Sequence, residues 1–388
     1  MNQTSKTIYQ AYIFVATGVA CLMLVHAMGR FAFTPLLPYL IQDHIITLTQ
    51  GANLATGNYV GYLVGALAAI YFNQPKKIKQ YIVFGLICNF AVTVTQCFVK
   101  DYDLLLALRL LNGISNGFVF VLAPALVLEW LSEHALSRLS GLVYLGIGVG
   151  LIFSGMLVDW TSTIFFGAWR WIPIAIACVP LFLLSVWQIP KIKIHPVAQS
   201  NKTSNALLNA HTTPLFLAYL GAGLGYILPM TFLPVLAHDV GENHVLLVKN
   251  IWLITALCCA VFIPIWNSLG TKFGDQSILF ISYWVQAIGV VCVMVFPNIF
   301  GVLGCAIFVG GSFMASVLCT QRLARFFQPH QGAKLSAAMI TIYAGAQLFG
   351  PWLAKWWIES GGTLLQSFAM GFIAFVWSIF WTWRMPKK

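Results

Sequence analysis

The sequence has few charged side chains, and very few of them are acidic. Asp, Glu, Lys and Arg make up 8% of its 388 residues, and Asp and Glu together number 10. Soluble domains carry about 25% charged residues, and a soluble fold of this length could not cover its surface with so few. The 9 Cys show no paired spacing, so they are expected to be buried thiols. The composition excludes a soluble enzyme, a disordered chain and a secreted disulfide scaffold.

Motifs for ATP use and for catalysis are also missing. The chain has no Gly-Lys-[Ser/Thr] loop, and its 8 His are dispersed without a metal-type cluster or a nucleophile motif. We therefore expect no ATP drive, no cofactor, no metal site and no enzymatic activity.

Long apolar runs are what the sequence has in abundance, since 60% of its residues are hydrophobic. A helix that crosses a bilayer needs about 20 mostly apolar residues. Such runs predict an all-α integral membrane protein with twelve transmembrane helices, at about 11–41, 48–72, 79–98, 103–131, 137–160, 168–189, 213–237, 246–270, 277–297, 299–327, 334–358 and 364–384. The polar stretch 190–212 predicts a cytoplasmic linker between six-helix halves at 1–189 and 213–388.

The basic residues predict the orientation in the membrane. They give the chain a net charge of +11, which in a soluble protein would suggest a nucleic-acid partner. With a cytoplasmic N-terminus, fifteen basic residues fall inside and three outside, as the positive-inside rule requires. We expect a multi-pass protein of the cell membrane, a bacterial inner membrane in particular. Both termini would be cytoplasmic, lipid would surround a functional monomer, and nucleic acid would not be a partner.

A weak internal repeat supports two halves. A shift of 196 residues places three residues of the first run, Gly29, Pro38 and Asp43, on Gly225, Pro234 and Asp239 of the seventh. Two parallel six-helix halves related about the membrane normal describe major facilitator transporters, whose substrate site lies near mid-membrane where the halves meet.

Three segments carry a family resemblance. Residues 29–38 (GRFAFTPLLP) and 57–66 (GNYVGYLVGA) resemble the YbfB/YjiJ family of the major facilitator superfamily. Arg109, followed by Gly113 and Gly117, is similar to the superfamily pattern of the fourth helix. The resemblance implies a secondary active transporter that works by alternating access.

Arg30 is the main candidate for substrate binding. It lies well inside the first run, where burying a cation costs at least about 2.5–3.5 kcal/mol, so it should face a cavity or a partner. Its planar fork suits a carboxylate or a phosphate, and its spacing to Pro38 is similar to that of the helix 1 arginine in organic-phosphate antiporters. The alternative is a structural Arg paired with carbonyls or a neighbouring helix.

Two further groups are candidates for proton coupling. His26 lies one helical turn before Arg30 and titrates near neutral pH, although a neutral packing role is the commoner use of such a residue. The superfamily resemblance links Arg109 to proton handling, and structural pairing with Asp43 or Asp101 is the equal alternative.

A cytoplasmic gate is predicted from the repeat. Glu129 falls on Arg325 at the shift of 196, so Glu129 paired with Arg325 or Arg322 would latch the halves together. A Glu solvated at a helix end is the alternative. Nearer the outer face, Asp159 and Arg170 are expected to pair locally, as are Lys355 and Glu359.

The remaining polar and aromatic groups inside the runs either line the cavity or bridge helices, and bridging is the commoner use. Those assigned to the substrate site are Asn58, Tyr59, Asn112, Asn116, Tyr226, Trp252 and Gln347.

The sequence therefore predicts a secondary active transporter of a small organic solute, an organic anion in particular, coupled to protons. Arg30 and the absence of a carboxylate from the centre of every span favour an anion. The alternatives are efflux of drugs or other hydrophobic compounds and a non-transporting membrane sensor.

Overall fold

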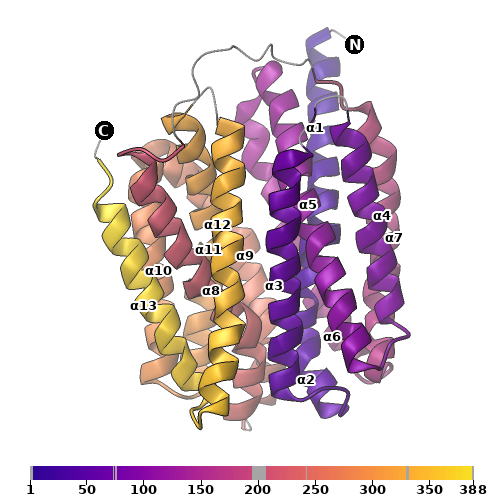
Figure 1. The fold of residues 1–388 in the computed structure, drawn as a ribbon, viewed down its shortest axis with the longest axis vertical. Helices are drawn as coiled ribbons and strands as arrows, with labels where there is room; N and C mark the ends of the chain where they lie inside the picture. Colours follow the sequence, from indigo (N-terminus) through magenta and orange to yellow (C-terminus); the bar gives the residue numbers. More distant parts are fainter. Residues whose placement is uncertain are drawn as a thin grey trace.

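The computed structural model describes residues 3–72, 74, 77–194, 207–241, 243–328 and 332–386. These residues form twelve long helical segments that lie side by side (Figure 1). The helices up to residue 191 are α1 (Gln3–Leu22), η1 (Met23–Phe31), α2 (Phe33–Gln42), α3 (Leu48–Tyr71), α4 (Ile78–Gln96), α5 (Tyr102–Glu133), η2 (Ser137–Tyr144), α6 (Leu145–Thr161), η3 (Gly167–Trp171), α7 (Ile172–Gln188) and η4 (Ile189–Lys191). The rest are α8 (Thr212–Val240), α9 (Val245–Phe273), α10 (Asp275–Val295), α11 (Ile299–Phe327), α12 (Gly332–Glu359) and α13 (Leu364–Trp383).

The observed helices match the predicted runs closely, with α1, η1 and α2 forming the first. That first helix begins at Gln3 rather than near residue 11, because polar residues continue it beyond the apolar stretch. Eleven of the helical segments are long and apolar enough to span a membrane. The twelfth, α12, has 28 residues but a lower hydropathy. It packs against both α3 and α8, and a helix enclosed by others can carry amides that lipid-facing helices cannot.

The helices fall into two groups. Figure 1 shows α1–α7 on one side and α8–α13 on the other, with both chain ends at the same end of the molecule. We call residues 3–194 the N-terminal half and residues 207–386 the C-terminal half. The two meet where α3 packs against α12 and where α6 packs against α9. The pseudo-symmetry of the halves stays a prediction, and residues 195–206 of the proposed linker lie outside the described residues.

Glycines bring α3 and α5 into backbone contact. A Cβ added at Gly65 would lie 2.0 Å from the carbonyl oxygen of Ile114, and one added at Gly113 would lie 2.0 Å from that of Asn58. Gly61 and Gly117 meet the facing backbone in the same way. Helices in membranes associate through such small-residue faces, so the glycines of the family motif build the scaffold around the site.

The first helix changes its hydrogen-bond register where it passes the centre of the molecule. η1 is a nine-residue π-helix, and the N–H of Ala32 donates to the carbonyl of Ala27, five residues back, at 2.9 Å. Pro35 and Pro38 follow in α2 and cannot donate to the turns before them. π-Helical turns are rare in proteins, and those that occur often lie at functional sites. This segment carries both His26 and Arg30.

Candidate functional site

The guanidinium of Arg30 lies buried between the two halves, with the residue 2% exposed. One of its nitrogens, Nη2, donates a hydrogen bond to Oε1 of Gln347, on α12 of the C-terminal half. Its Cζ lies 4.5 Å from the ring centroid of Tyr59 and 4.4 Å from that of Tyr62. Within the described residues, no acidic side chain pairs with it, and its Nε and Nη1 have no hydrogen-bond partner. A cation with free donors is therefore held at the interface.

Two further hydrogen bonds cross between the halves close to Arg30. Tyr59 and Thr231 join their hydroxyls at 2.8 Å, and the hydroxyl of Thr34 donates to the carbonyl of Met230 at 3.1 Å. All three bonds use neutral groups on one or both sides, so each can be exchanged for water or ligand without stranding an ion pair.

A central cavity of about 10 Å³, which is room for a single water, lies beside Arg30. The sequence-predicted residues Tyr226, Gln347 and His26 line it, together with residues from α3, α5, α6, α8, α11 and α12. The whole lining is His26, Tyr62, Phe120, Ile147, Tyr219, Tyr226, Phe313, Met314, Val317, Ile340, Tyr343 and Gln347. The lining contains no Asp, Glu, Lys or Arg, and Arg30 contacts two of the lining residues, Tyr62 and Gln347.

His26 contacts a second sequence-predicted residue. Its Nδ1 lies 3.2 Å from Oδ1 of Asn116, so Nδ1 donates and the amide oxygen accepts. Its ring packs against Phe120, with centroids 4.5 Å apart. The hydrogen bond fixes the ring and leaves Nε2 as the nitrogen that can exchange a proton.

Three other predicted residues, Asn58, Asn112 and Trp252, pack between helices and do not line the cavity. Asn58 donates to the backbone carbonyl of Arg109 and to Oδ1 of Asn112, each at 3.0 Å. These amides tie α3 to α5 within the N-terminal half. Trp252 lies 6.4 Å from Phe31 and packs over Gly155, where α6 meets α9. None of the three is among the residues that line the central cavity.

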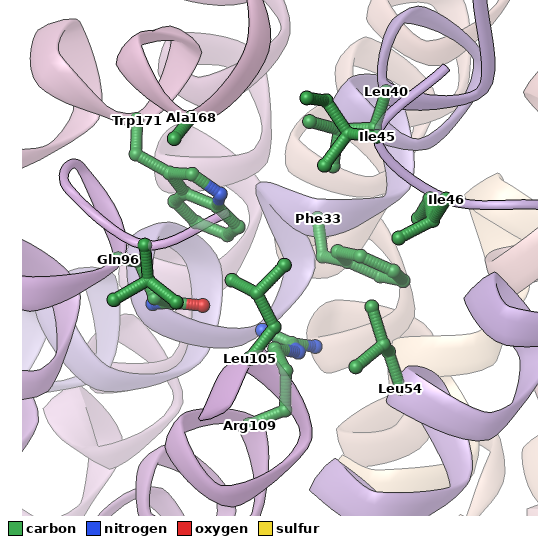
Figure 2. A pocket seen from close by; sticks show the side chains of 11 residues that line it. Phe33, Leu40, Ile45, Ile46, Leu54, Gln96, Leu105, Arg109, Ala168 and Trp171 are labelled. Atoms are coloured by element: carbon green, nitrogen blue, oxygen red, sulfur yellow. The ribbon is translucent and has the colours of Figure 1, made fainter. Parts of the chain in front are cut away.

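Arg109 lines a different pocket, which it shares with residues of α2, α3, α5 and η3 (Figure 2). Its Nη1 donates to the carbonyl of Gly29 at 3.3 Å and its Nη2 to that of Arg30 at 3.4 Å. The predicted pairing with Asp43 or Asp101 is wrong. Asp101 caps α5 by accepting from the N–H of Leu104, Asp43 pairs with Arg170, and Arg109 donates to two backbone carbonyls instead.

The carboxylate of Asp43 forms an ion pair with a third arginine, Arg170. Nε of Arg170 lies 2.6 Å from Oδ2 of Asp43, and the N–H of Gly167 donates to the same oxygen. The predicted Asp159–Arg170 pair is therefore wrong, and Asp159 instead accepts from the hydroxyl of Tyr39 at 3.3 Å. The hydrogen bonds from Arg170 hold the pKa of Asp43 below its ordinary value. The predicted Lys355–Glu359 pair is present, at 3.7 Å.

At the opposite end, the predicted gate residues do not all meet. Arg322 donates to Oδ1 of Asp275 at 2.5 Å and to Oδ1 of Asn267 at 2.9 Å. Both partners lie in the C-terminal half, so the Glu129–Arg322 pairing is wrong in this arrangement. Arg325 lies near enough for its charge to act on the Glu129 carboxylate. No ion pair joins them among the described residues.

Sequence reasoning missed several cavity residues. Tyr62 lies three positions after Tyr59, on the same face of α3, and Tyr219 lies two turns before Tyr226 on α8. Phe120 and Phe313 likewise face the space. Helical spacing from a predicted site residue would have found the two tyrosines, but aromatic residues in apolar runs are so often packing residues that the signal is weak.

The fold and the buried, exchangeable interface are those of a membrane transporter. The family described as uncharacterised MFS-type transporter YbfB matches residues 22–381, and the chain belongs to that family. Its fold is similar to the crystal structure of a mutant of the nucleoside transporter NupG, with a TM-score of 0.69, 14% sequence identity, and coverage of 97% of this chain and 100% of that one. Among curated proteins, none matches the chain.

Proposed function

We propose that this membrane transporter carries a small organic anion by alternating access. One observation carries the proposal: the Arg30 guanidinium lies buried between the halves, and among the described residues its one hydrogen-bond partner is the neutral Gln347, while Nε and Nη1 have none. An anion with two oxygens would offer the planar fork the charge-assisted bonds that it lacks. The neutral lining of the cavity gives a cationic substrate no counter-charge.

The mechanism follows from where the partners of Arg30 come from. Gln347 binds the guanidinium from the C-terminal half, and the anion takes over that bond when it enters. Because the substrate then touches both halves, rocking of one half against the other exposes the same site to either side of the membrane. We further propose that Glu129 and Arg325 draw together when the end that carries them closes, while Arg322 stays on Asp275.

The central test is ligand binding to wild-type protein and to Arg30→Ala. A panel of carboxylates and phosphate esters, screened by thermal shift on the purified chain, should give at least one ligand that raises the melting temperature of the wild type. Binding to Arg30→Ala should fall by more than about tenfold, because a charge-assisted bidentate contact contributes roughly 1.5–3 kcal/mol. Lys355→Ala, at the edge of the fold, is the matched control and should bind as the wild type does.

Two outcomes would overturn the proposal. One is that no anion binds. The other is that neutral hydrophobic drugs bind, with equal affinity for the wild type and Arg30→Ala, which would indicate hydrophobic-compound efflux instead.

We propose that His26 carries the coupled proton. It lines the cavity, and its Nδ1 is fixed by Asn116, so one nitrogen is left for exchange. His26→Gln in proteoliposomes should retain substrate binding but lose the dependence of uptake on an imposed proton gradient. Uptake by His26→Gln with an unchanged response to the gradient would show that His26 is a packing residue.

A further inference from the structure

The central cavity has aromatic walls on both sides. In the C-terminal half four rings form a nearly parallel stack. The Tyr226 ring lies 5.4 Å from Phe313 with an interplanar angle of 7°, and 5.2 Å from Tyr343 at 14°. Tyr343 in turn stacks on Tyr219 at 4.3 Å and 16°. The far side of the space is therefore a ladder of rings supplied by α8, α11 and α12.

The facing wall belongs to the N-terminal half. Tyr62 and Phe120 lie with centroids 5.8 Å apart, and the His26 ring packs 4.5 Å from Phe120. All three residues line the same cavity as the ladder. The space between the halves is thus lined by aromatic rings on opposite sides, and it forms a slot for a flat ring when the halves move apart. Flat rings gain most from such surroundings through offset and edge contacts.

The charge lies at one border of this slot. Tyr62 joins the two features, because its ring forms part of the lining and also lies 4.4 Å from Cζ of Arg30. Gln347 likewise lines the cavity and binds Arg30. Among the described residues Arg109 is not a second contact for the substrate, since both of its Nη groups donate to backbone carbonyls and it lines a different pocket. The site therefore offers one positive charge beside an aromatic slot.

We infer that the substrate is an aromatic monocarboxylate, a planar ring that carries a single carboxylate. The inference rests on the proposed function, because it gives the anion at Arg30 a body that fits the cavity. The carboxylate replaces Gln347 on the guanidinium, and the ring separates the two walls, with Tyr62 and Phe120 on one side and the Tyr226 ladder on the other. A dianion would leave one charge without a partner, and a short aliphatic acid would leave the rings without contact.

Four small ligands distinguish the contribution of the ring to binding from the contribution of the charge. Binding of benzoate, cyclohexanecarboxylate, benzamide and acetate is measured on the purified full-length chain. Benzoate should bind about fivefold or more tightly than cyclohexanecarboxylate, because ring–ring contact contributes beyond buried area. Benzamide, which lacks the charge, should bind at least about tenfold more weakly than benzoate, and acetate should be the weakest of the carboxylates.

A variant with a matched control tests the ladder itself. Tyr226→Leu removes its central ring and should reduce the preference for benzoate over cyclohexanecarboxylate to less than about twofold. Tyr283→Leu removes a tyrosine that is equally buried but lies outside the cavity lining, and should keep that preference. Because the readout is a ratio of two ligands on one protein, a general loss of stability does not imitate the effect.

The outcomes distinguish the inference from the proposed function. Equal binding of benzoate, cyclohexanecarboxylate and acetate, with all three lost in Arg30→Ala, would overturn the aromatic class and leave the anion site standing. Binding of benzamide as tightly as benzoate, or no effect of Arg30→Ala on any probe, would overturn both.

Discussion

Arg30 and Arg109 are neighbours in the same half, both 2% exposed and neither with an acidic partner among the described residues, yet their surroundings differ. Arg30 donates to a side-chain amide on the other half and keeps two nitrogens free. Arg109 donates to two backbone carbonyls of its own half. A bond to a movable side chain can be exchanged for ligand, whereas bonds to backbone carbonyls fix the helix that carries them. The first arrangement is suited to binding and the second to support.

The same difference runs through the packing around each residue. Asn58 and Asn112, next to Arg109, join α3 to α5 through amide hydrogen bonds where the glycines allow backbone contact. Around Arg30 the hydrogen bonds between the halves are single bonds, such as that between Tyr59 and Thr231. Strength within one half and exchangeability between the halves are what rocking motion requires.

The largest effect is expected from Arg109→Met. Methionine has a similar length but no donor, so the carbonyls of Gly29 and Arg30 would be buried without partners, at about 1–3 kcal/mol each. The thermal midpoint of the purified protein should fall markedly, and the yield of folded protein with it. Arg109→Lys, which can still donate to one carbonyl, should lie between the variant and the wild type. A wild-type midpoint for Arg109→Met would contradict a supporting role.

A smaller, pH-dependent effect on stability is expected from Asp43→Asn, which removes the acidic partner of the buried Arg170. The Arg170 hydrogen bonds lower the pKa of Asp43 from about 3.8, so the carboxylate stabilises the fold at pH values above the unfolded pKa. That contribution is lost as the pH falls through the lower folded pKa. Wild type should exceed Asp43→Asn by about 1 kcal/mol at neutral pH, after allowance for partial exposure.

The control for this measurement is the more exposed pair at the end of α12. Glu359→Gln should leave stability unchanged at every pH. A gap between wild type and Asp43→Asn that stays constant from pH 7 to pH 3 would show that the ion pair does not stabilise the fold.

The smallest effect on stability is expected from Arg30→Met without ligand. Both arginine variants remove a buried unpaired cation, which costs about 2.5–3.5 kcal/mol. Arg30→Met loses one charge-assisted bond, at about 1.5–3 kcal/mol, whereas Arg109→Met loses the donors of two buried carbonyls. The thermal midpoint should therefore stay within a few degrees of the wild type or rise slightly. A fall as large as that of Arg109→Met would show that both arginines are structural.

The helices and their limits were predictable because each apolar run is as long as a bilayer is thick and ends in polar residues. Arg30 was predictable because a cation inside such a run is costly wherever it lies. The partner of Arg170 was not. Gly167 adopts a φ of +59°, and this turn brings Arg170 and the Gly167 N–H to Asp43, which is far away in the sequence. Local spacing favoured Asp159 instead.

The partners of Arg109 were hidden for a similar reason. The sequence of residues 23–31 does not reveal a π-helical register, and carbonyls inside a helix are not expected to accept from an arginine on another helix. The aromatic slot was hidden because Tyr62, Phe120 and Phe313 differ from ordinary packing residues only in what faces them across the boundary between the halves.

The π-helical segment η1 has a consequence for insertions and deletions. A π-turn holds one residue more than the α-helical turn it replaces, so η1 is equivalent to a single inserted residue in the first helix. Deleting one residue between Met23 and Phe31 should convert the segment to an ordinary α-helix and leave α1 and α2 close to their present orientation, because the π-turn already absorbs the extra residue. A shortened chain of this kind would still be long enough to span the bilayer, but a deletion between His26 and Arg30 would reduce their spacing from four residues to three and so turn one of the two side chains relative to the other.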